Sequence, residues 1–401
     1  MVLCAAGCAT QSLADGSGTI FYTQRFDGPM TIVNRVQWDY VRATPSLIFS
    51  NQEVIWTGAG ALVGTGEPPP GCPDGRLAGS DGIFFTPDRG LVVGNWEPGR
   101  CGLSGQFWKF DPDETDVVLD GPSDGPFAFH MLLHPNLVDF LTTPALGGFA
   151  CADGMGPRGC FGVYDHTPLT TSLLCLAPLD SFDNDPMQPV TFIADGAENM
   201  FALFTEELSV QFGGAGFASF DIGSTTSAVC AGDMAMRELI PLGIEAAHSI
   251  SWDPFLSDLS VRGGTPHSDF IVFANSTVQQ IRVINPGTPG ATASIVATID
   301  MSVEEVCHSL LPSKNAEFDQ GAVTGEGIAL VGDETSGFLA LIDYSQNTNG
   351  LIIDGFNTVC LTEFLHDQID DIAPLTGLGA DPLLFEKFFD SGFEEGESLP
   401  D

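Results

Sequence analysis

Three histidines recur in similar sequence surroundings, and together they could hold a metal ion or exchange protons with a substrate. They open the segments His130-Met-Leu-Leu-His-Pro, His248-Ser-Ile-Ser-Trp-Asp-Pro and His308-Ser-Leu-Leu-Pro. Imidazole groups bind transition metals and change charge near neutral pH. Asp81 opens a comparable segment and would add a carboxylate ligand. The alternative is structural, because a histidine at a strand start can donate to a nearby carbonyl group, and repeats copy such residues.

These histidines mark an internal repeat of four short apolar runs. Segments 81–121, 248–300 and 308–354 contain the runs in the same order, and segments 129–178 and 191–242 follow it more loosely. The runs are four to seven residues long and end at Gly, Pro, Asn or Asp, which is typical of β-strands. In segment 308–354 the first run starts at His308 and the last at Leu351. Four strands joined by short turns correspond to one blade of a β-propeller.

The repeat predicts an all-β fold, a β-propeller of four-stranded blades. Units of about 45–60 residues give six blades over residues 20–380, with seven as the alternative. Asp371-Ile-Ala-Pro-Leu is expected to be the last strand and to close the ring. A helix-like spacing of apolar residues is short and limited to places such as Leu361–Ile369.

Equivalent strand starts on a ring converge at the mouth of the central channel. We therefore expect His130, His248 and His308 to begin three innermost strands and to meet there, with Asp81 beside them. Glu198 or Asn199 would open the fourth unit and is a further ligand-binding candidate. The predicted site would hold one divalent metal or a small molecule. By contrast, Asp111-Pro-Asp-Glu-Thr-Asp lacks the Gly and terminal Glu of an EF-hand, so we interpret it as a turn.

Two segments resemble a known group of propellers. His248 to Ile284 looks like an NHL-type blade, and Asp81 to Pro112 resembles blades of NHL and SMP-30/gluconolactonase-like six-bladed propellers. Members of this group include lactonases, lyases and exported binding proteins, so the resemblance implies an architecture rather than one activity. It also implies that histidines from separate blades could ligate a catalytic metal, as in NHL-like lyases. Gluconolactonase-like enzymes instead use carboxylate and Asn ligands, for which Asp81 and Glu198 are the counterparts here.

The charge balance excludes several classes of partner. The chain has 401 residues with 13 Lys and Arg against 53 Asp and Glu, a net charge of −40. Nucleic acids and anionic membrane surfaces require cationic patches, so we expect neither as a partner. No apolar run approaches the roughly 18 residues of a membrane span. The motif H-E-x-x-H and the P-loop are absent, which argues against zincin and nucleotide chemistry.

The two termini and the cysteines predict an extracytoplasmic location. Residues 1–10 resemble the end of an export signal, and Ala6-Gly7-Cys8 resembles a lipoprotein cleavage site, which makes Cys8 a lipidation candidate. A simple signal cut after Ala6 or Ala9 is the alternative. The acidic, aromatic tail 381–401, which we expect to be disordered, contains Phe-Asp-Ser-Gly-Phe-Glu and resembles tails of exported gammaproteobacterial proteins. We therefore expect a secreted, periplasmic or outer-membrane lipoprotein of a Gram-negative bacterium, with residues 1–19 as signal remnant and linker.

Eight cysteines remain once Cys4 and Cys8 are set aside. No close C-x-x-C pair occurs among them, so disulfides are favoured over a metal site, and pairing of successive cysteines is the economical arrangement. The disulfide candidates are Cys72, Cys101, Cys151, Cys160, Cys175, Cys230, Cys307 and Cys360.

These observations predict an exported, monomeric propeller that binds a small molecule or a protein at the central channel face. A metal-dependent lyase or lactonase that uses the histidines is the first alternative. An interaction scaffold anchored to the cell envelope through Cys8 is the second.

Overall fold

A computed structural model describes the chain from Gly16 to Pro374 with gaps, and the segments that it describes contain strands and turns but no helix. The described residues are 16–24, 32–56, 80–86, 88, 90–95, 105–115, 117–125, 128–133, 139–144, 160–165, 175–178, 188–194, 200–205, 216–220, 236–241, 247–258, 264–274, 277–286, 288, 291–301, 318, 321–333, 337–347, 349–353, 359–365, 369 and 371–374.

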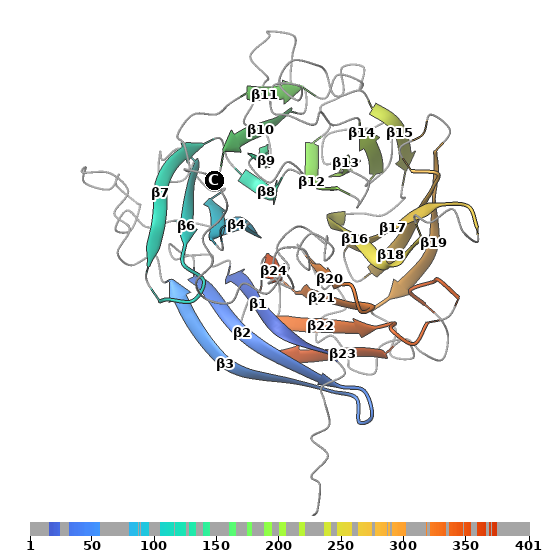
Figure 1. Cartoon of the computed structure of the whole chain (residues 1–401), viewed down its shortest axis with the longest axis horizontal. Coiled ribbons are helices and arrows are strands. Elements are labelled where there is room, and N and C mark those ends of the chain that lie inside the picture. The colour runs from blue at the N-terminus through green and yellow to red at the C-terminus, as the bar shows by residue number, and fades with distance from the viewer. Residues whose placement is uncertain are drawn as a thin grey trace, which may run out of the picture.

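Within these residues the strands form six four-stranded antiparallel sheets, arranged as a ring (Figure 1). We call each sheet a blade and number the blades along the chain. From the inner to the outer strand, the first three blades contain β24 (Ile372–Pro374), β1 (Gly16–Gln24), β2 (Ile32–Val41) and β3 (Ser46–Trp56); β4 (Ser80–Phe85), β5 (Leu91–Asn95), β6 (Gly105–Phe110) and β7 (Val118–Gly125); and β8 (Ala128–Leu133), β9 (Asp139–Pro144), β10 (Cys160–Asp165) and β11 (Cys175–Pro178).

Blades 4 to 6 repeat this order. They contain β12 (Gln188–Ala194), β13 (Met200–Thr205), β14 (Gly216–Phe220) and β15 (Met236–Pro241); β16 (Ala247–Asp258), β17 (His267–Ala274), β18 (Thr277–Ile284) and β19 (Thr292–Asp300); and β20 (Ala322–Thr324), β21 (Ile328–Gly332), β22 (Phe338–Asp343) and β23 (Val359–Phe364). The predicted all-β class of four-stranded blades is confirmed.

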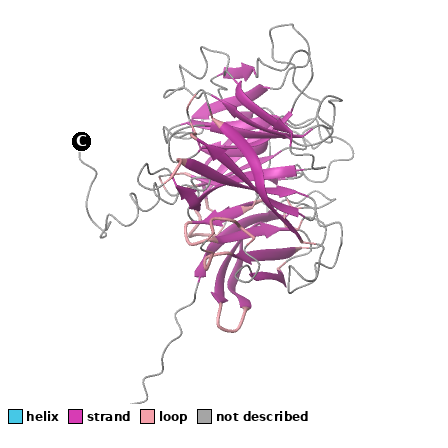
Figure 2. Cartoon of the chain, turned by 90° about the vertical axis from the view of Figure 1, so that its right-hand side faces the viewer, coloured by secondary structure: helices cyan, strands magenta, loops and turns pink. Residues whose placement is uncertain are grey.

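The ring is closed by the two ends of the described chain. Strand β24 pairs with β1, with Phe21 opposite Ala373, so the first blade combines a C-terminal inner strand with three N-terminal strands. This confirms the predicted closing strand. The six inner strands contact one another in the cyclic order β4, β8, β12, β16, β20 and β24. Figure 2, a view turned by 90°, shows that strands make up most of the described chain, with few loops among them.

The sixth blade differs from its prediction. Its inner strand is Ala322–Thr324 and its outer strand is Val359–Phe364, instead of runs that begin at His308 and Leu351. The outer strand pairs with β22 over six residues, Phe338 opposite Phe364 to Asp343 opposite Val359, whereas residues 351–353 form no strand. The Leu361–Ile369 spacing that suggested a helix therefore begins within a strand.

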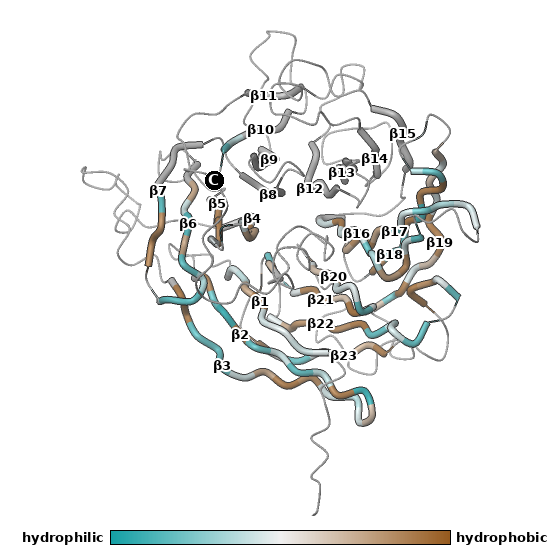
Figure 3. Tube along the Cα trace, viewed as in Figure 1, coloured by the Kyte–Doolittle hydropathy of each residue, from teal (hydrophilic) through white to brown (hydrophobic). Residues whose placement is uncertain are grey.

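A strand such as β21, in the middle of a blade, packs against both neighbouring blades and is buried on both faces. Every residue of β21 is buried: Ala329 and Val331 lie in the core between blades 5 and 6, whereas Ile328 and Leu330 lie in the core between blades 6 and 1. Successive side chains of a strand point to opposite faces, so one apolar run supplies two cores. Figure 3 shows the same trend, because β4 near the centre is mainly hydrophobic and β2 farther out carries more hydrophilic residues.

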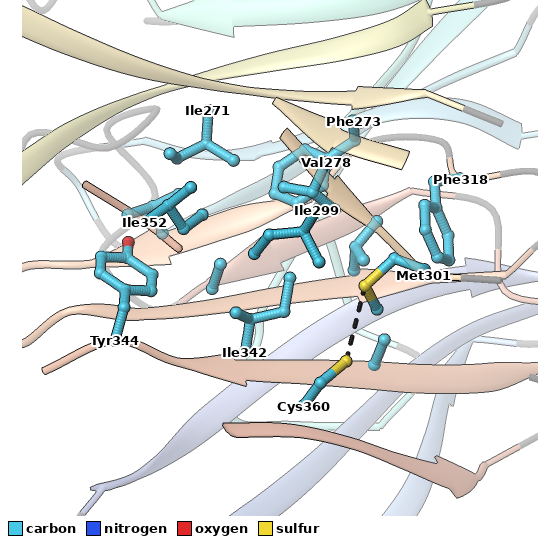
Figure 4. Close-up of a cluster of buried hydrophobic side chains, with 14 of the residues drawn as sticks. Ile271, Phe273, Val278, Ile299, Met301, Phe318, Ile342, Tyr344, Ile352 and Cys360 are labelled. Carbon is cyan, nitrogen blue, oxygen red and sulfur yellow. Dashed lines mark hydrogen bonds between the residues drawn. The ribbon is translucent and has the colours of Figure 1, made fainter. Parts of the chain in front are cut away.

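The core between blades 5 and 6 is shown in Figure 4. The side chains of Phe273, Ile299 and Ile342 are fully buried there. The Sγ atom of Cys360 in β23 lies 3.5 Å from the Sδ atom of Met301, which directly follows β19. This contact joins the outer strand of blade 6 to the end of blade 5.

Candidate functional site

Four inner strands have a backbone irregularity near their start. We call the end at which the inner strands begin the channel entrance. Contacts between neighbouring strand starts show that they share this end. Asp371, just before β24, bonds to Gly82 of β4, and Gly321, just before β20, bonds to Ser249 of β16.

The pairing register shifts at each of the three predicted residues that lie in inner strands. The shift in β4 falls between Ser80 and Ile83 and brackets Asp81. The shift in β8 falls between Ala128 and Met131 and brackets His130. The shift in β16 falls between Ala247 and Ser249 and brackets His248.

Such shifts are β-bulges, in which an extra residue leaves the ladder and the strand bends. Bulges re-aim side chains and are over-represented at rims and active sites. A further shift in β12, between Pro189 and Thr191, lies near the start of the fourth inner strand. Four of the six inner strands therefore begin with a bulge, and in three of them the bulge contains a predicted site residue.

Asp371 links the closing strand to the bulge of blade 2. It is fully buried, and its Oδ2 atom accepts a hydrogen bond from the Gly82 amide. Thr23 of β1 holds Asp371 from the other side: the Thr23 amide donates to the Asp371 carbonyl at 3.0 Å, and the Asp371 amide donates to Thr23 Oγ1 at 3.1 Å. Sequence analysis identified Asp371 as a strand start but missed it as an entrance residue.

A second set of hydrogen bonds joins two neighbouring blades, 5 and 6, at the entrance. The Gly321 amide donates to Ser249 Oγ at 3.2 Å, and Ser251 Oγ donates to the Gly321 carbonyl at 3.2 Å. A Cβ atom at Gly321 would lie 2.4 Å from the ring of Phe273, so only glycine fits without displacing that ring. The backbone of blade 6 is thereby held against β16, one residue from His248.

The other predicted site residues have different positions. His308 precedes β20 in the chain and lies outside the described residues, so the expectation that it begins an inner strand is wrong: that strand starts at Ala322. Glu198 and Asn199 also lie outside the described residues, and in the chain they come between β12 and β13 instead of opening a blade. The acidic run after Phe110 is a turn between β6 and β7, as predicted, in which the Asp113 amide donates to Asp111 Oδ1 at 2.9 Å.

Several predictions about the chain ends and cysteines cannot be placed on the fold. Cys8, Cys72, Cys101, Cys151, Cys230, Cys307 and the tail 381–401 lie outside the described residues, whereas Cys160 and Cys175 open β10 and β11. Among the side chains that are described, no three His, Cys, Asp or Glu residues gather as a metal site. The proposed ligands Asp81, His130 and His248 are not among those side chains, so a metal at the entrance stays a prediction.

Farther along β16 from the entrance, two carboxylates face each other within blade 5. Asp253 of β16 pairs directly with Asp269 of β17, and both are fully buried. Asp253 Oδ1 accepts from the amides of Phe255 at 2.8 Å and Leu256 at 3.1 Å, and Oδ2 accepts from Tyr344 Oη of blade 6 at 2.6 Å. Burial, together with the nearby Asp269, raises the pKa of Asp253 to about 7 despite these hydrogen bonds.

Asp269 is the carboxylate of this cluster that binds Arg282. Arg282 Nε lies 2.9 and 3.2 Å from its two carboxylate oxygens, Gln280 donates to Oδ1 at 2.8 Å, and His267 Nε2 lies 3.2 Å from Oδ2. Burial raises the pKa of Asp269, and the Arg282 hydrogen bond opposes that rise. Gln280 and Arg282 also donate to the Gly350 carbonyl at 3.0 and 2.6 Å, so the cluster joins blades 5 and 6.

A related cluster joins blade 6 to blade 1. Asp343 at the end of β22 accepts hydrogen bonds from Tyr40 Oη at 2.8 Å and from Arg42 Nε at 2.7 Å, and Ser345 also donates to it. Burial favours protonation of Asp343, but the hydrogen bonds from Arg42, Ser345 and Tyr40 outweigh it and lower its pKa.

All four cations whose side chains are described are paired with carboxylates of the same chain. The pairs are Arg35–Glu53, Arg42–Asp343, Lys109–Asp88 and Arg282–Asp269. The described part of the fold therefore uses these four positive charges in ion pairs within the chain.

Comparison with known proteins places the fold but no family. No protein-family model matches the sequence, and no curated protein is similar to it in sequence. A chain in a crystal structure of a nidogen/laminin complex is 9% identical, with 91% of this chain and 100% of that chain covered and a TM-score of 0.50. A streptogramin B lyase is 13% identical over 80% of this chain and 91% of its own, with a TM-score of 0.38.

A putative 6-phosphogluconolactonase from Bacteroides fragilis is 11% identical over 90% of this chain and 98% of its own, with a TM-score of 0.43. These structures are β-propellers. The fold is a β-propeller. At such low identity the similarity to the chain of the nidogen/laminin complex supports this architecture and does not separate the NHL and SMP-30 types. Within the described part of this propeller, no helix is long and apolar enough to cross a membrane.

Proposed function

We propose that this propeller binds a ligand at the channel entrance, and that Asp81, His130 and His248 contact it. The observation that carries the proposal is the coincidence of three register shifts with these three residues at the starts of β4, β8 and β16. A bulge that served only to bend a strand would not require an Asp or a His. Repeated bulges with ligand-type residues at one end of a channel are what a binding site requires.

The chemistry of these residues favours a divalent transition metal, alone or bridging to a small molecule. Imidazole nitrogen and carboxylate oxygen are suitable ligands for zinc and related ions. The surplus of acidic residues would also raise the local concentration of cations. His308, in the segment before β20, is proposed as a further ligand. The resemblance to NHL-like lyases and gluconolactonase-like enzymes makes lyase or lactonase chemistry the second candidate function.

Metal content of the purified protein tests the proposal. We expect the tag-free protein to bind about one Zn²⁺ or Co²⁺ per chain in elemental analysis and titration calorimetry. His130→Ala and His248→Ala should each weaken binding at least tenfold, because each removes one ligand. His166→Ala is the matched control, since His166 follows β10 in the chain and belongs to none of the predicted site segments. Equal, weak binding by the wild type and all three variants would overturn the proposal.

We further propose that the protein is exported and carries disulfides. The N-terminal signal-like residues and the even number of remaining cysteines support this, as does Cys360, which is disulfide-bonded. Mass spectrometry of the mature, non-reduced protein tests it. Eight oxidised cysteines are expected, and a lipid on Cys8 would favour the envelope-anchored scaffold.

A further inference from the structure

We propose that Asp371 is a positioning residue that orients the backbone at Asp81, so that the closing strand β24 completes the entrance site. The inference rests on the proposed function, because it assigns the control of one of the proposed ligands. It assigns Asp371 no contact with the ligand.

Asp371 is well placed for this role because it is itself held rigidly. Its side chain is fully buried, and its backbone amide and carbonyl both bond to Thr23 of β1. The carboxylate is therefore fixed relative to blade 1. Its Oδ2 atom accepts the Gly82 amide of blade 2, from a residue 289 positions away in the chain.

Gly82 has a backbone conformation that needs such support. Its φ is +81°, in the region that favours glycine, and it lies within the register shift of β4. An amide in a bulge is displaced from the ladder and must find another acceptor when it is buried. The side-chain oxygen of Asp371 supplies that acceptor.

The hydrogen bond acts directly on Asp81. The Gly82 N–H belongs to the planar peptide group whose other end is the Cα atom of Asp81. Fixing the direction of this N–H fixes the plane and hence the ψ angle of Asp81. The direction in which the Asp81 side chain leaves the strand is thereby tied to the position of Asp371. The closing strand thus sets the backbone of a site residue in the next blade.

Two substitutions at Asp371 separate positioning from general stability. Asp371→Ala removes the acceptor, whereas Asp371→Asn keeps an oxygen that can accept the Gly82 amide. We expect Asp371→Ala to weaken Co²⁺ binding about tenfold and Asp371→Asn to retain most of the affinity. Tyr40→Phe is the control: it removes a buried hydrogen bond to Asp343 at the other end of blade 1, so it should lower stability while leaving Co²⁺ affinity within about twofold.

A double-mutant cycle gives the decisive readout. If Asp371 acts through Asp81, Asp371→Ala should have no effect on Co²⁺ affinity in an Asp81→Ala background, but its full effect in a His248→Ala background. An equal loss in both backgrounds would overturn the inference. So would an affinity of Asp371→Ala equal to that of the wild type.

An NMR measurement on the metal-free protein keeps the inference separate from the proposed function. In ¹⁵N-glycine-labelled protein, we expect the Gly82 amide proton to shift upfield by about 1 ppm in Asp371→Ala, because it loses its hydrogen bond to the Asp371 side chain. An unchanged Gly82 resonance overturns the positioning role even if metal binds. A shifted resonance in a protein that binds no metal supports the backbone role and overturns only the proposed ligand.

Discussion

Two boundaries between neighbouring blades, which we call the 5–6 seam and the 6–1 seam, each pair a tyrosine with an aspartate. The pKa values of the two aspartates nevertheless shift in opposite directions. Between blades 5 and 6, Tyr344 donates to Asp253, and between blades 6 and 1, Tyr40 donates to Asp343. Both hydroxyl groups and both carboxylates are buried. The pKa of Asp253 is raised to about 7, chiefly by burial, whereas the pKa of Asp343 is lowered.

The two pKa shifts differ because the arginine of each seam binds a different carboxylate. Arg42 bonds directly to Asp343, but in the described part of the 5–6 seam Arg282 bonds to Asp269 and not to Asp253. Asp253 thus faces a second carboxylate with only neutral donors of its own. A tyrosine hydroxyl and two backbone amides do not compensate for burial of a charge beside another negative group.

This contrast has a definite consequence for stability. Because the pKa of Asp253 is about 7 in the folded protein against 3.8 ordinarily, the folded state holds a proton that the unfolded state releases. Its contribution is complete below about pH 4 and is lost as the pH rises toward 7. Asp343 behaves in the opposite sense: its lowered pKa stabilises the fold at neutral pH, and that stabilisation is lost only in acid.

The largest expected effect comes from removing Arg282, the cation in the described part of the 5–6 seam. Arg282→Met should lower the free energy of unfolding by about 3–5 kcal/mol at pH 8, because Asp269 stays buried without its main partner. The loss should be smaller at pH 5, where Asp269 can bind a proton. Urea unfolding at both pH values measures this. Equal losses at the two pH values would contradict the view that the cation governs this seam.

A matched pair of substitutions gives effects of opposite sign and intermediate size. Asp343→Asn should cost about 2–3 kcal/mol at pH 8, because Arg42 and Tyr40 lose a charged acceptor. Asp253→Asn should stabilise the protein by about 1–2 kcal/mol at pH 8, because an amide carries no charge and fits the same space.

Thermal unfolding at pH 5 supplies the control for this pair. There the stabilisation by Asp253→Asn should disappear, since Asp253 is already protonated, while the loss from Asp343→Asn should persist. Destabilisation by both substitutions to the same extent at pH 8 would show that the two carboxylates are equivalent and would remove the contrast.

The smallest expected effects on stability come from removing the hydroxyl groups of the two tyrosines. Tyr40→Phe should cost about 1–2 kcal/mol at both pH 5 and pH 8, because Asp343 is charged at both. Tyr344→Phe should cost more at pH 8 than at pH 5, because its hydrogen bond to Asp253 gains a charged acceptor only at the higher pH. Denaturant titrations of the two variants at each pH test this. A pH-dependent loss for Tyr40→Phe would count against the assigned charge states.

Much of the architecture could be predicted from the sequence because blades repeat locally. The segment 81–121 corresponds to β4–β7, and 248–300 corresponds to β16–β19. The prediction was wrong in blade 6, where long connections hide the strand order. Leu361, Leu365 and Ile369 have helix-like spacing, yet all three are buried between blades 6 and 1, since pairing with β22 overrides the local pattern.

The candidate site was only partly predictable. Repeat alignment correctly brought Asp81, His130 and His248 to inner-strand starts, since one blade copies another. The same alignment misplaced His308, because similarity of a short motif does not establish pairing. Nothing in the sequence marks Asp371 as a site residue beyond its place before the last strand. Its proposed role depends on a hydrogen bond to the Gly82 amide, which belongs to another blade.

The sequence by itself determined the all-β class, the four-stranded repeat, the closing strand and the surplus of acid, because strand length, turn residues and charge are local properties. Only the tertiary structure decided which charges meet. Arg42 finds Asp343 across 301 residues, and Asp253 is left facing Asp269. Ring closure brings these groups together, and burial then turns small differences in their neighbours into opposite pKa shifts.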